Sequence, residues 1–183
     1  MPGACAARRI SSRKSAPFGT NGTTDLPFEK IYLDSNVFIS VAAGEVSGIG
    51  AAVVQFATTA APSPKFATSE LALSEVLVHP FRFNDTVLAS QYRSLIVGHS
   101  WIEALAVERE ILIEAAALRA RNGYLKLPDA IHISTALACG CSHMLTDDRR
   151  LRDAYASWSG DARLAIIRPT LETLDAILAW VRA

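Results

Sequence analysis

An α/β fold built on a mostly parallel sheet is predicted from three features of the sequence. Short apolar runs, the first of them Ile31-Tyr32-Leu33, have the length of buried strands. Longer segments with helical spacing separate these runs, so strands and helices alternate along the chain. The 183 residues are 50% hydrophobic with a formal net charge of +0, which suits one folded domain with a sizeable core.

The composition also excludes several classes of protein. High apolar content with balanced charge excludes a wholly disordered chain and a globally basic nucleic-acid binder. No apolar run approaches the roughly 20 residues of a membrane span, and no apolar segment of a secretory signal follows the basic N-terminal residues. Three cysteines without framework spacing argue against a disulfide-stabilised secreted protein, so we expect a reducing, cytoplasmic environment. Cys139 and Cys141 are expected to be small apolar residues at a helix end.

Two segments of different character divide the chain. Residues 1–29 are dominated by Ala, Arg, Ser, Gly, Thr and Pro without periodicity, which is typical of a flexible tail. Four basic residues there would attract nucleic acid, but an inert leader fits the composition better. The apolar pattern starts at Lys30, so we expect the domain to span 30–183.

The first half of this domain begins with the strand 31–33, and Ser35 then allows a helix to start. A helix over 49–60 is broken by Pro62. A strand over 65–68 leads into a helix over 69–78, which a hydroxyl side chain caps and Pro80 stops. The remaining elements of this half are a helix over 85–97 and a strand over 101–105.

The second half continues the alternation. A helix over 107–121 ends before Asn122-Gly123, and Pro128 opens a helix over 129–138 that Gly140 ends. A strand over 143–146 is followed by a polar loop or turn. The closing elements are a strand over 163–167 and an amphipathic helix over 170–181.

Carboxylates occur where the chain is otherwise apolar. Asp34 follows the first strand, Asp147 and Asp148 follow the strand ending at Thr146, and Asp129 lies in the first turn of an apolar helix. Ligands of parallel α/β sheets bind beyond the carboxyl ends of the strands, so these acids can meet there. Crowded carboxylates repel unless a cation neutralises them, and Mg²⁺ or Mn²⁺ is the natural neutraliser. Such a site activates water and stabilises charge on a phosphodiester.

Each acid also has an ordinary structural explanation. Asp34 is a favoured helix N-cap residue, and Asp129 complements a helix dipole. Glu75 can face solvent, and Asp147-Asp148 suits an exposed turn. The recurrence of acids at strand ends favours the common site.

Four segments resemble a PIN-domain ribonuclease of the kind that forms the toxin of VapBC-type toxin–antitoxin pairs. The acids that match the family pattern are Asp34 in Leu33-Asp34-Ser35-Asn36, Glu75 in Leu73-Ser74-Glu75-Val76, Asp129 in Leu127-Pro128-Asp129-Ala130, and Asp148 in Leu145-Thr146-Asp147-Asp148. Each motif is weak alone, but the four occur in order between matching strands and helices. The resemblance covers roughly residues 30–170 and leaves the N-terminal tail unmatched.

The resemblance implies a three-layer sandwich with a five-stranded parallel sheet in the order 3-2-1-4-5. It also implies metal-dependent endoribonuclease activity that leaves a 5′-phosphate and a 3′-hydroxyl. The four matched acids would bind Mg²⁺ or Mn²⁺ and carry the catalysis. Asn36, Thr146 and Asp147 would lie behind these acids and orient them. One carboxylate would take the proton of the attacking water.

Binding partners are expected on the same basis. Candidates for guiding the RNA backbone are Arg82, Arg93, Lys126 and Arg149. An antitoxin protein would cover the acidic cleft. The apolar helices near Phe81, Phe83 and Tyr92 would form the groove that binds this antitoxin, or a homodimer face. The alternative is that these aromatics are buried in the core. His132 lies on nearly the same helix face as Asp129, and we expect a core histidine there.

Two other functions compete with the nuclease. A phosphatase of the haloacid-dehalogenase type needs a second Asp two residues after the first, and Asn36 stands there instead. A PIN-like module that binds or scaffolds RNA without catalysis would show loss of acids, whereas all four are present.

Overall fold

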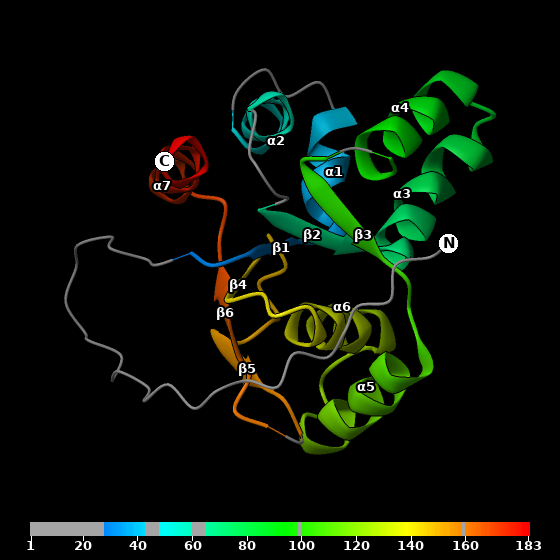
Figure 1. The fold of residues 1–183 in the computed structure, drawn as a ribbon. Coiled ribbons are helices and arrows are strands. Elements are labelled where there is room, and N and C mark those ends of the chain that lie inside the picture. The colour runs from blue at the N-terminus through cyan, green and yellow to red at the C-terminus, as the bar shows by residue number, and fades with distance from the viewer. Residues whose placement is uncertain (1–27, 43–47, 60–64, 99, 159) are drawn as a thin grey trace.

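The computed structural model describes residues 28–42, 48–59, 65–98, 100–158 and 160–183 (Figure 1). The strands of this part are β1 Ile31–Leu33, β2 Phe66–Ser69, β3 Ile102–Leu105, β4 His143–Leu145, β5 Ala154–Ala156 and β6 Arg163–Ile167. Its helices are α1 Ser35–Ala42, α2 Ile49–Thr58, α3 Glu70–Arg82, α4 Thr86–Ile96, α5 Arg109–Arg121, α6 Leu127–Ala138 and α7 Leu171–Arg182. Residues 1–27 of the predicted tail lie outside the described part of the chain.

The strands form one sheet in the order β3-β2-β1-β4-β6-β5. The first five are parallel, which confirms the predicted α/β class and the predicted order, with β6 in the fifth position. The predicted count of five strands is wrong, because β5 pairs antiparallel with β6 at the edge. Only Tyr155 of its three residues is buried, so the segment carries no apolar run that would reveal a strand.

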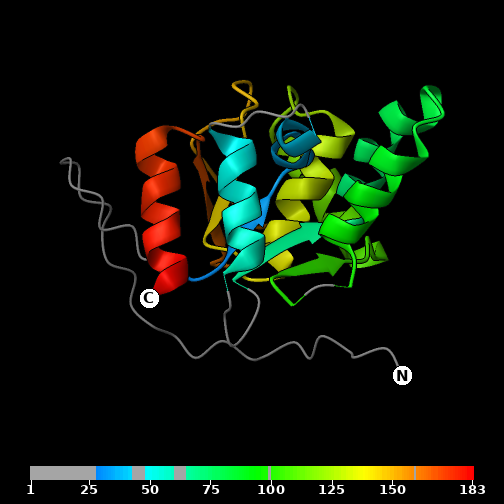
Figure 2. The same cartoon turned by 90° about the horizontal axis from the view of Figure 1, so that it is seen from above.

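Helices cover both faces of this sheet (Figure 1). Helices α1, α2, α3, α4 and α7 pack on one face, and α5 and α6 pack on the other. Seen from above in Figure 2, α7 (red) and α2 (cyan) stand side by side, in agreement with their contacts. Successive side chains of β1 alternate between the two cores: Ile31 and Leu33 point toward the first, and Tyr32 points toward α6.

Helix α3 corrects the prediction that Pro80 stops a helix at about Val78. The helix continues to Arg82 with Pro80 buried inside it. A proline removes one helical N–H, the one that would bond the carbonyl four residues earlier, so α3 continues through Pro80 with one hydrogen bond fewer. The Pro80 carbonyl accepts the Asp85 N–H at 2.8 Å, which closes the turn into α4.

Other predicted helix ends are confirmed. The Ser69 hydroxyl accepts the Ala72 N–H as the cap of α3, and Thr170 caps α7 in the same way. Gly140 follows the end of α6 with a positive φ of 72°, a conformation that favours glycine. None of the helices in the described ranges has the length and apolar character needed to cross a bilayer.

Candidate active site

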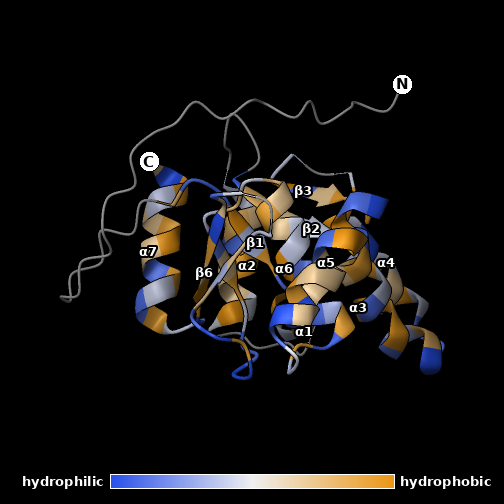
Figure 3. Ribbon diagram, turned by 90° about the horizontal axis from the view of Figure 1, so that it is seen from below, coloured by the Kyte–Doolittle hydropathy of each residue, from blue (hydrophilic) through white to orange (hydrophobic). Residues whose placement is uncertain are grey.

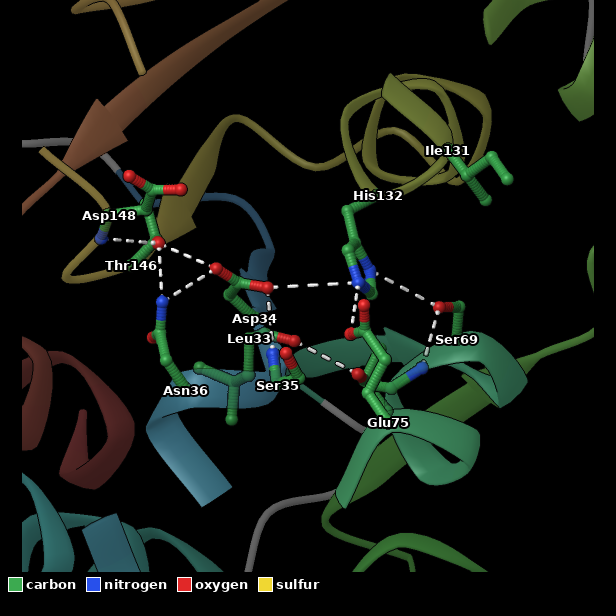
Figure 4. A network of polar contacts seen from close by, with 12 residues as sticks. Leu33, Asp34, Ser35, Asn36, Ser69, Glu75, Ile131, His132, Thr146 and Asp148 are labelled. Carbon is green, nitrogen blue, oxygen red and sulfur yellow. Dashed lines mark hydrogen bonds and ion pairs between the residues drawn. The ribbon is translucent and has the colours of Figure 1, made fainter. Parts of the chain in front are cut away.

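Asp34 leaves the carboxyl end of β1 and is almost enclosed, with 7% of its surface exposed. Its Oδ2 accepts hydrogen bonds from Asn36 Nδ2 at 2.8 Å and from the Thr146 hydroxyl at 2.6 Å. Its Oδ1 accepts the Ser35 N–H at 2.8 Å (Figure 4). Three donors therefore replace the water that a buried carboxylate loses, and they fix the direction in which it points.

Thr146 joins this carboxylate to the loop that follows β4. Besides donating to Asp34, its buried hydroxyl accepts from Asn36 Nδ2 at 2.9 Å and from the Asp148 N–H at 3.1 Å. Asn36 Oδ1 in turn accepts the Asp147 N–H at 3.3 Å. Asn36 and Thr146 thus lie beside Asp34 as expected, whereas Asp147 is exposed and reaches the network through its backbone.

His132 occupies the other side of Asp34. Its Nε2 lies 2.9 Å from Glu75 Oε2 and 3.8 Å from Asp34 Oδ1, and only 2% of the residue is exposed. The expectation of a core histidine is therefore confirmed, yet the ring also contacts two of the predicted acids. Asp34 follows Tyr32 by two residues, so both side chains point to the same side of the sheet. This is why both lie near His132 of α6.

The buried hydroxyls of Tyr32 and Ser69 lie beside the second ring nitrogen of His132, Nδ1. Tyr32 Oη lies 2.7 Å from His132 Nδ1 and donates to Ser69 Oγ at 2.9 Å. Burial raises the pKa of Tyr32 well above its ordinary value, so the group remains a neutral hydroxyl. Ser69 is also the cap of α3, so the ring of His132 is oriented by the same residue that starts the helix carrying Glu75.

Two opposing influences act on Glu75. Burial raises the pKa of its carboxyl, but the hydrogen bond and charge of His132, with a hydrogen bond from the Ser35 side chain, bring that pKa below its ordinary value. Glu75 is therefore held as a carboxylate on the same ring nitrogen of His132 that Asp34 approaches (Figure 4).

His132→Phe is expected to lower the free energy of unfolding by about 1–3 kcal/mol, because Glu75 and the Tyr32 hydroxyl each lose a buried partner. His132→Gln keeps an N–H donor and should lose less. Urea denaturation measures both, with the exposed His79→Phe as the matched control. Equal unfolding midpoints for wild type and His132→Phe would contradict this interpretation.

Asp129 lies in the first turn of α6 and shares the electrostatic environment of the other acids. Burial raises the pKa of its carboxyl, and the charges of Asp148 and Asp34 raise it further, while the Arg150 charge opposes them. Side chains from two other segments therefore act on the ionisation of Asp129.

Asp129→Asn is expected to raise the thermal unfolding midpoint at about pH 7. Because the folded-state pKa lies above the ordinary value of 3.8, the stability contributed by Asp129 is present below that value and lost as the pH rises through the folded-state pKa. The asparagine does not titrate, so the variant does not lose this stability. The difference in unfolding midpoint between the variant and wild type should therefore shrink as the pH falls toward about 4. Thermal melts across this range, with exposed Asp175→Asn as control, test the sign; a lower midpoint at neutral pH contradicts it.

Two arginines that the sequence analysis missed organise Asp148. Arg150 donates from Nε to both carboxylate oxygens, at 2.9 and 3.1 Å, and this hydrogen bonding lowers the pKa of Asp148 against the effect of burial. Arg168 follows β6 and donates to the backbone carbonyls of Asp148 and Leu151, each at 2.7 Å. A basic residue at the carboxyl end of the neighbouring parallel strand is the signal that points to Arg168.

The donor set of the cleft fits a hard divalent cation. Carboxylate oxygens are the ligands that Mg²⁺ and Mn²⁺ prefer, and the mutual repulsion of Asp34, Asp129 and Asp148 is what such an ion relieves. Among the described residues, no group of three or more acidic, histidine or cysteine side chains already converges on one point. Arg150 instead supplies the positive charge beside Asp148.

The four predicted basic residues divide into two pairs. Lys126 immediately precedes α6, whose first turn carries Asp129, and Arg149 is the residue after Asp148. Arg82 ends α3 and Arg93 lies on α4, where it lines a groove with Phe81. The first pair therefore lies next to the acids in the chain and the second belongs to the α3–α4 hairpin.

Comparison with protein families matches most of this chain to one family. The profile of the PIN domain matches residues 31–157. The chain belongs to the PIN domain family. The matched span includes Asp34, Glu75, Asp129 and Asp148 together with Tyr32 and His132.

Solved structures share the PIN fold with this chain. A toxin–antitoxin complex from Klebsiella pneumoniae has a TM-score of 0.53 at 22% identity, covering 77% of this chain and 98% of that one. VapBC2 from Rickettsia felis, bound to a DNA fragment from its promoter, has a TM-score of 0.52 at 13% identity, covering 75% and 97%. The comparison with curated protein sequences found no relative.

Proposed function

We propose that this PIN domain is a metal-dependent endoribonuclease and the toxin of a VapBC-type toxin–antitoxin pair. The observation that carries the proposal is that Asp34 and Glu75 both contact His132 Nε2, while the charges of Asp34 and Asp148 both act on Asp129. Membership of the PIN domain family and the two toxin–antitoxin neighbours support it. RNA in the cytoplasm is the proposed substrate.

The four acids have distinct surroundings, which suggests distinct roles. Asp34 is pinned by three donors and provides a fixed ligand for Mg²⁺ or Mn²⁺. Asp129 and Asp148 provide carboxylates whose repulsion a cation relieves, and Glu75 approaches from the His132 side. A bound dication supplies a water of lowered pKa and stabilises charge on the phosphodiester. Thr146 and Asn36 keep the Asp34 carboxylate aimed into the cleft.

Arg150 is proposed to exchange partners when substrate enters. Its side chain is exposed, and in the free protein it forms a bidentate pair with Asp148. An arginine in this place can turn toward an RNA phosphate, for which its planar donors are equally suited. Lys126 and Arg149 then extend a basic rim along the cleft, which a chain without net charge needs for RNA.

RNA cleavage with and without EDTA tests the proposed activity. We expect wild type to cleave a labelled RNA only with Mg²⁺ or Mn²⁺, leaving 5′-phosphate ends, and Asp129→Asn to be inactive under both conditions. Because that variant should remain folded, its inactivity cannot be attributed to loss of structure. Equal cleavage with EDTA, or by the variant, would overturn the proposal.

A non-catalytic RNA-binding module is the second candidate, favoured by one observation. No three metal-binding side chains of the described ranges converge in advance. This candidate predicts RNA binding without cleavage at any metal concentration, so the same assay separates the two functions.

The α3–α4 hairpin is the proposed docking site of the antitoxin. Phe81 and Phe83 are 65% and 63% exposed, whereas Tyr92, predicted with them, is buried. Figure 3 shows apolar segments along this projecting hairpin. Further exposed apolar side chains there are Val78, Val87 and Val97. Phe81 borders a groove of about 560 Å³. Several large apolar side chains exposed on one hairpin are typical of a protein interface.

Mass measurement by light scattering, for wild type and Phe81→Ser/Phe83→Ser, tests this docking site. A monomer that binds its antitoxin only when both phenylalanines are present supports it. A stable homodimer that the double variant dissociates would assign the hairpin to self-association instead, as the sequence analysis allowed.

A further inference from the structure

A pair of thiols lies at the amino ends of the central strands, whereas Asp34 and Asp148 follow the carboxyl ends. Cys139 and Cys141 are both free, and their Sγ atoms lie 3.3 Å apart. They flank the end of α6, whose first turn carries Asp129, so the whole helix separates the thiols from the acids. The nuclease proposal makes no use of them.

The backbone turn after α6 holds the two thiols together. The Cys141 N–H donates to the Ala136 carbonyl at 2.9 Å, and the Gly140 N–H donates to the Leu137 carbonyl at 3.2 Å. This pair of bonds is the Schellman motif, in which glycine takes the positive φ between the flanking residues. The approach of the two thiols is therefore a consequence of the helix cap.

The two thiols differ in charge and in access. The hydrogen bond from Cys141 lowers the pKa of Cys139 despite burial, and the nearby Lys30 ammonium lowers it further. The same contact and burial raise the pKa of Cys141. Cys139 is partly exposed and Cys141 is only 3% exposed, so an oxidant reaches Cys139 first. A partly exposed thiol of lowered pKa beside a second thiol is an arrangement found in redox-sensitive sites.

Lys30 is itself anchored in this place. Its Nζ pairs with Glu103 Oε2 at 2.5 Å, and its carbonyl accepts the Ser142 N–H at 3.0 Å. The start of β1 and the segment that carries the thiols are thus joined. The ammonium is held near Cys139 by the start of β1 and by Glu103 of β3, which lies beyond β2 in the sheet.

We propose that Cys139 and Cys141 are a modification site that forms a reversible intramolecular disulfide on reaction with a hydroperoxide. The Cys139 thiolate attacks the peroxide oxygen, which breaks the O–O bond and gives a sulfenic acid and water or an alcohol. The Cys141 sulfur then attacks the Cys139 sulfur and displaces the hydroxyl as a second water. The two thiols lose two electrons and two protons, and the peroxide gains them.

Hydrogen peroxide treatment of the full chain carrying Cys5→Ser tests this proposal, since that variant retains only the two thiols in question. After denaturation and alkylation with N-ethylmaleimide, we expect the oxidised chain to carry neither of its two adducts and to have lost two hydrogens in mass. Dithiothreitol should restore both adducts. In the additional variant Cys141→Ser, dimedone should trap the sulfenic acid on Cys139.

Three results would overturn the proposal. They are retention of both alkylation sites after peroxide, addition of oxygen at Cys139 without loss of the Cys141 site, and a disulfide found only between two chains. The main measurement uses a protein with both thiols intact, so a folding defect of the Cys141→Ser variant does not affect it. RNA cleavage is not the readout, so the result stands apart from the nuclease proposal.

Discussion

Asp34→Asn is expected to lower the rate of metal-dependent RNA cleavage by more than about 100-fold. Loss of a residue that only orients a metal ligand costs up to about 100-fold, and loss of a ligand itself should cost more. We propose the Asp34 carboxylate as a metal ligand, and its orientation is fixed because Ser35, Asn36 and Thr146 all donate to it. An amide in its place turns an N–H toward some of these donors and loses the negative charge. Single-turnover cleavage of a labelled RNA at saturating Mn²⁺ measures the effect.

Asp175→Asn is the matched control for this result. Asp175 lies exposed on α7, away from the contacts of Asp34, and the substitution has the same size and the same change in charge. The control should cleave at the wild-type rate. Urea denaturation should show that Asp34→Asn is folded under assay conditions. A folded Asp34→Asn protein with more than a tenth of the wild-type rate would remove Asp34 from the proposed site.

Thr146→Val is expected to have the second largest effect, on stability as well as on activity. The buried hydroxyl donates once and accepts twice, so its loss leaves Asp34, Asn36 and the Asp148 N–H each short of a partner. Leaving buried polar groups unsatisfied costs about 1–3 kcal/mol of unfolding free energy. The cleavage rate should fall by about 10–100-fold, because the Asp34 carboxylate and the Asp148 loop lose their shared anchor.

Thr146→Ser separates these causes, since it keeps the hydroxyl and removes only a methyl group. We expect its cleavage rate to remain within a few-fold of wild type, with a loss of about 1 kcal/mol for the buried methyl. Urea denaturation and single-turnover cleavage are measured on both variants. If Thr146→Val retains full activity, the hydroxyl does not position the acids, and the network has a structural role alone.

The placement of the acids could be predicted because it depends on patterns that are local in sequence. A polar residue directly after a buried parallel strand lies at the carboxyl edge of the sheet wherever the strand sits, which located Asp34 and Asp148. Glu75 and Asp129 needed the resemblance to the PIN domain, since each has an ordinary explanation as a helix residue. The order of the parallel strands came from the same resemblance.

The contacts that the sequence analysis missed depend on tertiary geometry. Tyr32 looks like any core residue of a strand, and only the packing of α6 against β1 brings its hydroxyl to His132. Arg168 lies 20 residues from Asp148 in sequence and meets it because β4 and β6 are neighbours. A pairing between distant segments leaves no periodicity in either of them.

Two errors of secondary structure have local causes. The strand β5 contains one buried side chain, Tyr155, and pairs with β6 through its backbone, so hydrophobic patterning gives no signal. Pro80 was predicted to stop α3, but the helix continues through it to Arg82, because a proline removes only one helical hydrogen bond.

Calorimetric titration with Mn²⁺ tests the central claim most directly, because it asks whether the acids form one cation site, independently of any RNA. Wild type, Asp34→Asn, Asp129→Asn and the control Asp175→Asn are compared in metal-free buffer at equal concentrations. The account predicts saturable binding by wild type and the control, and its loss in both site variants. Saturable binding that is unchanged in Asp34→Asn and Asp129→Asn, or no binding by the wild-type protein, would contradict it.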